Sequence, residues 1–310
     1  MIDLKNYDKY EKSGLTYGGA AGSKLGIIID EDKWFLKYPK STKSLEGVDI
    51  SYSTAPLNEY IASNIYKTIG IETHETALGI ASNKVVVACK DFLGVNEILY
   101  DFNAIKNSYN PIIEEQTEKF SSSYGICDLE EITLMAKENM YFKKLNKLHE
   151  HFWDMFVVDS LIDNHDRNNG NWGIILNRAT SQMRIAPVYD NGAAFYNKSD
   201  SDKMKNILKD DKKFKQVAYD SARTVFKENG KSLNPLKYIE SMQNEFCNNA
   251  ILRIVPQIDI NEIEKIFDEI PERFEQFIVM DKTQKEFYLK ILKYRYEEIL
   301  LPTFKKLSTK

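Results

Sequence analysis

The chain has 310 residues, 43% of them hydrophobic and 28% charged, a composition typical of a globular protein with one large domain or two lobes. Its formal net charge of −4 and its pI of about 5.8 give no support to a general nucleic-acid-binding role, which requires a basic surface. Three cysteines far apart in the sequence, Cys89, Cys127 and Cys247, argue against a disulfide framework or a zinc site.

The N-terminal sequence and the apolar runs bear on where the protein acts. The first residues contain no apolar segment of the secretory type, and no apolar run approaches the ~20 residues of a membrane span. The sequence therefore predicts a cytoplasmic protein, with neither a membrane nor a nucleic acid as its partner.

The first ninety residues combine strand and helix patterns. Short β-branched or aromatic runs at 25–29, 34–37 and 84–88 predict strands. Between the second and third runs, residues 58–69 repeat isoleucine at every fourth position, which predicts a helix. We expect a small α+β lobe over residues 1–90.

The remainder of the chain is mostly helical in pattern. Helices are predicted over 129–148 and 145–163, and a further strand over 184–189. From residue 203 to the end, helical segments are interrupted by prolines. The whole pattern predicts an α+β, bilobal fold, in which a mostly helical lobe over 91–310 follows a hinge near residue 90.

One polar stretch, DNHDRNNGNWGIIL at Asp163–Leu176, carries the strongest chemical signal. Asp166 and Asn171 are five residues apart, and Asp190 ends the strand-like run that follows. Phosphoryl transfer needs one carboxylate to accept the proton of the attacking hydroxyl, and oxygen ligands to hold magnesium against the phosphates. Protein kinases use this order and spacing. We therefore predict Asp166 as the catalytic base and Asn171 and Asp190 as magnesium ligands, brought together by a hairpin.

The first lobe offers groups suited to ATP. Lys37 ends a predicted strand, and Glu59 lies in the first turn of the predicted helix, where it can pair with the lysine as in kinases. The sequence YGGAAGSKLG, Tyr17–Gly26, predicts a turn whose backbone can approach phosphates. Its predicted nucleotide-binding residues are Gly18, Gly19, Ala20, Ala21, Gly22 and Ser23.

Taken singly, these features have simpler explanations. A D-x4-N pair is common, Lys37 alone is most simply a surface lysine, and the glycines alone predict only a turn. Their conjunction in the kinase order makes the pattern specific. Arg167 either orients Asp166 or a phosphate, or is a plain surface residue. His165 is expected to shape the loop rather than to transfer a proton, and Asp163 to cap its helix rather than to assist magnesium.

The chain resembles the HipA-like serine/threonine kinases. The resemblance rests on KYP at 37–39, NEY at 58–60, LIDNHDRNNGNWGI at 161–174 and APVYDNG at 186–192. It implies a protein-kinase-like fold and an ATP- and Mg²⁺-dependent serine/threonine protein kinase. It gives Asp166, Lys37, Asn171 and Asp190 the roles proposed above, and implies that a hinge strand places Lys90 and Phe92 at the adenine.

The resemblance also implies autophosphorylation in the glycine loop, with Ser13, Thr16 and Ser23 as candidate acceptors. The protein substrate is unknown, and the chain itself is one candidate partner. The glycine loop is about one residue longer than the family pattern. Because this loop starts near residue 17, we expect no counterpart of the N-terminal extension of HipA toxins, which weakens any expectation of an antitoxin. Export without a cleavable signal, into host cells, is an alternative location that the resemblance adds.

Two rival functions follow from the same motifs. A small-molecule or lipid phosphotransferase of the aminoglycoside or choline kinase type shares the D-x4-N loop and a later aspartate. A degenerate kinase fold could instead serve as a binding module. The KYP and NEY motifs favour the HipA-like interpretation over the first rival, and the presence of Lys37, Asp166, Asn171 and Asp190 disfavours the second.

Overall fold

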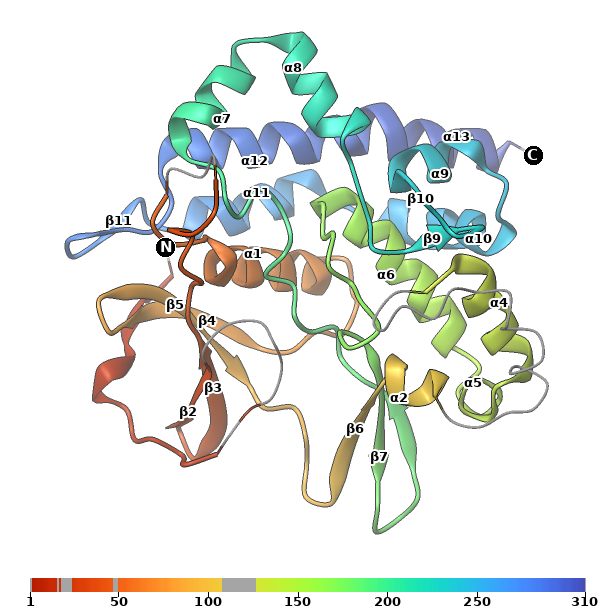
Figure 1. Cartoon of the computed structure of the whole chain (residues 1–310), viewed down its shortest axis with the longest axis horizontal. Helices are drawn as coiled ribbons and strands as arrows, with labels where there is room; N and C mark the ends of the chain where they lie inside the picture. The colour runs from red at the N-terminus through yellow and green to blue at the C-terminus, as the bar shows by residue number, and fades with distance from the viewer. Residues whose placement is uncertain (1, 16, 18–23, 47–49, 108–126, 310) are drawn as a thin grey trace. The chain divides into compact units, whose positions relative to one another are not determined.

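A computed structural model describes residues 2–15, 17, 24–46, 50–107 and 127–309 (Figure 1). Thr16 and the predicted phosphate-binding residues 18–23 lie outside these ranges. Packing divides the chain into two compact units, and each combines segments from several parts of the sequence. These packing units need not coincide with the two lobes of a kinase. The lobe boundary expected between residues 90 and 91 therefore stays a prediction.

The first unit comprises Met1–Phe92, Asp190–Ala218 and Ile258–Tyr294. Its centre is a five-stranded sheet in the order β1-β4-β5-β3-β2, in which β1 runs parallel to β4 and the other neighbours are antiparallel. The strands are β1 (Lys5–Asn6), β2 (Lys24–Ile29), β3 (Asp32–Lys37), β4 (Thr76–Ala81) and β5 (Lys84–Lys90).

The strands expected near 25–29, 34–37 and 84–88 are confirmed as β2, β3 and β5. The sequence did not predict β4, whose TALGIA contains the weak strand formers alanine and glycine. Gly79 is required there, because a Cβ would come within 2.3 Å of the Lys5 carbonyl oxygen and 2.4 Å of the Tyr7 ring. The pairing of β4 with β5 on one side and β1 on the other therefore outweighs its local preference.

The helix expected at 58–69 is α1 (Ala55–Thr68), which starts three residues earlier with Pro56 in its first turn. It packs against β4 and β5 (Figure 1). Nine of its 14 residues are buried, Ile61 and Ile65 completely. The other elements of this unit are α7 (Ser201–Leu208), α8 (Asp211–Lys215), α11 (Ile260–Glu269), α12 (Lys282–Tyr294), the hairpin β11 (Arg273–Phe274) and β12 (Phe277–Ile278), and the short 3-10 turn Tyr7–Lys9.

The second unit comprises Leu93–Tyr189, Tyr219–Gln257 and Arg295–Lys310. Its three-stranded antiparallel sheet has the order β6-β7-β8, and most of the unit is helical. The strands are β6 (Glu97–Asp101), β7 (Gly173–Asn177) and β8 (Met183–Ile185), with a small hairpin of β9 (Lys227–Glu228) and β10 (Lys231–Ser232). The helices are α2 (Phe102–Lys106), α4 (Leu129–Glu138), α5 (Met140–Lys144), α6 (Leu148–Ile162), α9 (Pro235–Ser241), α10 (Glu245–Ile254) and α13 (Leu301–Ser308).

Two expectations for this unit need correction. The single helix expected over 129–148 is interrupted at Asn139, whose extended backbone ends α4 and whose side chain accepts the Tyr141 N–H to start α5. The strand expected over 184–189 is β8, which ends at Ile185. Pro187 follows shortly and has no N–H with which to continue the ladder.

Aromatic side chains form much of the core of the second unit. Phe152 on α6 packs against Trp153, Trp172 and Phe226 with ring centroids 5.1–5.2 Å apart. Trp153 and Trp172 are buried, which confirms the core role expected for them. Across the described ranges, every helix is too short or too polar to span a lipid bilayer.

Candidate nucleotide and catalytic site

Lys37 is held between two carboxylates within the first unit. It is the last residue of β3 and is buried, and its Nζ lies 2.8 Å from Glu59 Oε2 and 2.8 Å from Asp190 Oδ1. Burial alone would lower the pKa of this lysine, but the charges of Asp190 and Glu59 raise it above the ordinary value. The expected ion pair with Glu59 is therefore present, and the ammonium group stays charged. Its role in binding ATP remains a prediction.

Asp190 adopts a backbone conformation suited to a sharp turn. Its φ of 60° lies in the left-handed region, which aspartate tolerates better than most residues. Gly192 follows, and a Cβ there would lie 3.1 Å from the Ala55 carbonyl oxygen and 3.2 Å from Glu59 Oε2. The glycine thus allows this turn to approach α1 closely, next to the ion pair.

The carboxyl group of Asp190 is suited to act as a magnesium ligand. Burial would raise its pKa, yet the charge of Lys37 keeps the pKa below the ordinary value, so the group is ionised. One oxygen accepts a hydrogen bond from Lys37, and no donor among the described residues is found on Oδ2. A hard cation prefers such an ionised oxygen.

Glu59 is the centre of a second set of contacts, on its other oxygen. Oε1 accepts a hydrogen bond from the Asn191 backbone N–H at 2.9 Å and lies 2.9 Å from His74 Nε2. Burial would raise the pKa of Glu59, but Lys37 and His74 hold it far below the ordinary value. The buried carboxylate therefore has partners from three different segments of the chain.

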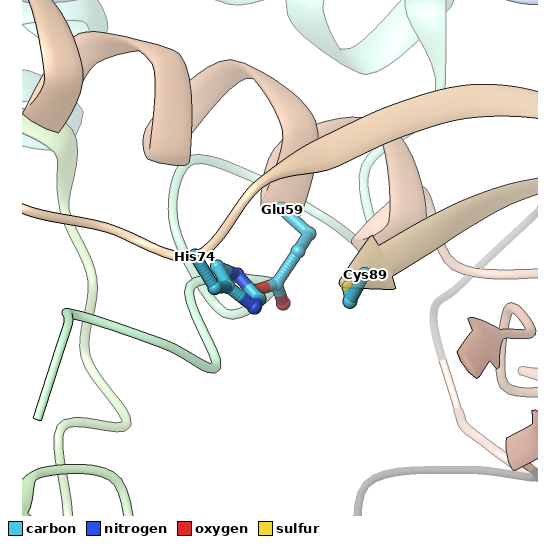
Figure 2. Close-up of side chains that lie close together, drawn as sticks. All are labelled: Glu59, His74 and Cys89. Atoms are coloured by element: carbon cyan, nitrogen blue, oxygen red, sulfur yellow. The ribbon is translucent and has the colours of Figure 1, made fainter. Parts of the chain in front are cut away.

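Glu59, His74 and Cys89 also offer potential metal-ligand atoms within 4.8 Å of one another (Figure 2). Two observations favour a hydrogen-bonded network over a metal centre. The ammonium group of Lys37 is already bound to the glutamate, so a cation here would meet a second positive charge. Burial raises the pKa of the Cys89 thiol well above its ordinary value, whereas a metal requires the thiolate.

The hinge residues lie at the end of β5 and just beyond it. The Lys90 side chain pairs with Asp32 at 2.6 Å, and its backbone N–H donates to the Glu75 carbonyl oxygen. The Asp91 N–H donates to the Lys33 carbonyl oxygen. The side chain and the backbone N–H of Lys90 therefore both have partners within the first unit. The expected contacts of Lys90 and Phe92 with adenine remain predictions.

The loop after α6, in the second unit, holds Asp166 and Asn171. Asp166 is exposed, and its Oδ1 accepts a hydrogen bond from Asn168 Nδ2 at 3.0 Å. Asn171 Nδ2 donates to the Asp166 backbone oxygen at 2.7 Å. Because this carbonyl can only accept, it must face the NH₂ group of Asn171. The amide oxygen, which is the atom a magnesium ion binds, is thereby left for a ligand.

Arg167 is completely buried, which excludes the plain surface role, whereas the orientation of Asp166 or a phosphate by this arginine stays a prediction. Its Nε and Nη2 bind the two oxygens of Asp159 on α6 at 2.8 and 3.1 Å. Its Nη1 donates to the backbone oxygens of Asn171 and Tyr189. The arginine therefore fastens the loop to α6 and to the residue that precedes Asp190 in the chain.

Asp163 caps the end of α6, as expected. It adopts the left-handed conformation, with φ 58°, after the last helical residue, and its carboxylate binds Arg295 Nη2 at 2.9 Å. Burial and the charge of Arg223 lower the pKa of the neighbouring His165, which therefore favours the neutral form. The role of His165 in shaping the loop stays a prediction.

The structure brings together two groups of predicted residues. Lys37, Glu59 and Asp190 meet in the first unit, and Asp166 and Asn171 meet in the second. The expected approach of Asn171 to Asp190 stays a prediction.

Sequence reasoning overlooked His74 and Asn191, since a single histidine and a single asparagine carry no motif. In the structure Lys24 opens β2 and is half-buried. Its pKa is lowered by burial and by Lys37, against the opposing charge of Asp190, so it is close enough to the cluster to interact with it.

Residues 16–273 match the family described as the HipA-like C-terminal domain, so the chain belongs to the HipA-like family. It is 32% identical over 285 residues to the serine/threonine-protein kinase CtkA of Helicobacter pylori strain J99, a match that covers 92% of this chain and 82% of that protein. The chain is a kinase of this family.

Solved structures agree in fold. The crystal structure of the Helicobacter pylori proinflammatory kinase CtkA matches with a TM-score of 0.84 and 28% identity over 99% of both chains. HipA of Shewanella oneidensis MR-1, solved with HipB and its operator DNA, matches with a TM-score of 0.55 and 11% identity, over 97% of this chain and 70% of that one. The expected α+β, protein-kinase-like fold is therefore confirmed.

Proposed function

We propose that the chain transfers the γ-phosphate of ATP, with Mg²⁺, to serine or threonine hydroxyls of proteins, its own included. The observation that carries this proposal is Lys37, buried and held charged between Glu59 and Asp190 at 2.8 Å. A buried lysine paired with a helix glutamate is the arrangement that kinases use against nucleotide phosphates. The family membership and the similarity to a serine/threonine-protein kinase support the same acceptor class.

In this proposal each residue has one task. Lys37 binds phosphate oxygens of ATP, and Glu59 keeps the ammonium group in place. Asp166, exposed on its loop, aligns the acceptor hydroxyl and accepts its proton as the oxygen attacks the γ-phosphorus. The amide oxygen of Asn171 and the carboxylate of Asp190 hold magnesium, which neutralises charge on the phosphates.

The test is transfer of labelled phosphate from ATP to a generic protein, with sugars, choline and lipid offered in parallel. We expect label on protein, and none after chelation of magnesium. Asp166→Asn should lower kcat by about a hundredfold or more while the dissociation constant of Mg-ATP changes little. Asp202→Asn, which changes an exposed aspartate on α7, is the matched control. Label only on small molecules or lipid, or an active Asp166→Asn variant, contradicts the proposal.

Autophosphorylation is tested by mass spectrometry after incubation with Mg-ATP. Ser13, Thr16 and Ser23 are the candidate acceptors, and Ser13 is the one within the described residues. Its backbone N–H donates to the Gly26 carbonyl oxygen, beside β2. We expect phosphate on one of these three candidate residues in the unsubstituted protein and on none of them in the Asp166→Asn variant. Modification elsewhere, or none, removes this part of the proposal.

We propose host signalling proteins as further acceptors, because the Helicobacter pylori relative is described as a proinflammatory kinase. This acceptor class requires export of the protein. The test compares phosphorylated proteins in host-cell extracts treated with the unsubstituted protein or with Asp166→Asn, and looks for the chain in the culture medium. Identical phosphorylation patterns in the two extracts contradict it.

A further inference from the structure

His74 is a buried histidine that no sequence motif singles out. It lies between α1 and β4, and its side chain is almost completely inaccessible. Nε2 is 2.9 Å from Glu59 Oε1. A carboxylate oxygen accepts hydrogen bonds, so Nε2 must carry the proton and donate it. Figure 2 shows the imidazole ring directly beside the Glu59 carboxylate.

The contact belongs to a closed network of buried polar groups. Asn191 donates its backbone N–H to Glu59 Oε1 at 2.9 Å and its side-chain Nδ2 to Ser63 Oγ at 3.0 Å. Ser63 Oγ lies 3.3 Å from His74 Nε2, which completes the circuit. All four residues are at least 97% buried, so water cannot replace any member that is removed.

The network acts on the ion pair through Glu59. Its Oε2 binds Lys37, while its Oε1 is fixed by His74 and Asn191. A carboxylate fixed at one oxygen cannot rotate, so the other oxygen stays aimed at the lysine. Asn191 directly follows Asp190, the second partner of Lys37, so the same network also fixes the turn that carries this aspartate.

We propose that His74 is a positioning residue for phosphoryl transfer, acting through Glu59 to hold Lys37 where it meets ATP. This inference rests on the proposed kinase function. His74 Nδ1 has no hydrogen-bond partner within the described residues, so a purely structural histidine would be poorly satisfied here. The useful contact of the ring is the one it makes with the carboxylate.

The test combines two substitutions of His74. His74→Phe keeps the ring and removes the donor, and we expect kcat to fall about ten- to hundredfold, the typical effect of losing a hydrogen bond to a charged group. The KM for the protein acceptor should not change. His74→Gln places an amide N–H near the position of Nε2 and should recover most of kcat. A control on α1, the helix that carries Glu59, is Ile65→Ala, which leaves a cavity in the core without removing a member of the network.

A double-mutant cycle separates positioning from stability. If His74 acts through Glu59, then His74→Phe in a Glu59→Gln background should change kcat less than about threefold, because the two losses are not independent. The same cycle is measured on unfolding in urea. Additive effects on kcat, a loss in Ile65→Ala equal to that in His74→Phe, or coupling in stability alone overturns the inference. An unsubstituted protein that neither binds Mg-ATP nor transfers phosphate overturns the proposed function itself.

Discussion

Replacing Arg167 by methionine should destabilise the second unit strongly. The guanidinium group is completely buried and makes two hydrogen bonds to Asp159, at 2.8 and 3.1 Å, besides those to the Asn171 and Tyr189 carbonyl oxygens. Its removal leaves a buried carboxylate without a cation, which costs about 3–5 kcal/mol, and each orphaned carbonyl adds about 1 kcal/mol. We therefore expect the free energy of unfolding to fall by about 5–7 kcal/mol.

The partner substitution tests whether the charge is responsible. Asp159→Asn in the Arg167→Met background removes the unpaired charge and keeps an oxygen that can accept from Asn164 Nδ2. We expect the double variant to recover about 2–3 kcal/mol, so the two single effects should be strongly non-additive. Arg178→Met, an exposed arginine just after β7, is the control and should change stability by less than about 0.5 kcal/mol.

Tryptophan fluorescence can report this unit by itself. Of the three tryptophans, Trp153 and Trp172 lie in the second unit and Trp34 in the first. Urea unfolding in a Trp34→Phe background therefore follows the unit that contains Arg167. A loss below about 1 kcal/mol in Arg167→Met, or additive single effects within about 0.5 kcal/mol, would refute the reasoning.

Two further predictions concern the same unit. Gly173→Ala should lower its free energy of unfolding in urea by about 3 kcal/mol, because the new Cβ would meet the backbone oxygen of Tyr100 at 2.1 Å; a change below about 1 kcal/mol would show that β6 can move aside. His149 and His151 on α6 have pKa values lowered from 6.5 to about 4 by burial. Between pH 6.5 and 4 the unfolded chain therefore binds more protons than the folded chain. As the pH falls from 7 to 5, each histidine should lower the free energy of unfolding by about 2 kcal/mol. His151→Gln should remove about half of this pH-dependent loss of stability, because one of the two histidines is gone. An unchanged dependence of the free energy of unfolding on pH would contradict the burial effect.

The sequence could predict candidate residues for phosphoryl transfer because kinase function constrains short local patterns. The five-residue step from Asp166 to Asn171, the lysine that ends a strand and the NEY at 58–60 can each be read without coordinates. The strands β2, β3 and β5 were predictable for a similar reason, since the β-branched residues of β2 and β5 and the aromatic residues of β3 carry the preference locally.

What the sequence could not determine depends on contacts between distant residues. β4 forms because strands on both sides pair with it, and the sequence TALGIA alone does not predict a strand. The choice between a surface role and an orienting role for Arg167 stayed open until its burial was known, because the sequence alone does not show which side chains are buried. His74 is separated from Glu59 by 15 residues and Asn191 by 132.

The sequence by itself therefore determined the family, the order of the motifs and the residue types suited to phosphoryl transfer. Only the tertiary structure decided which groups hold those residues in place. The physical reason is that chemistry requires particular side chains, which the sequence displays, whereas positioning requires buried partners. Burial is a property of the whole packed unit, so the links from Arg167 to Asp159 and from His74 to Glu59 appear only once the chain is folded.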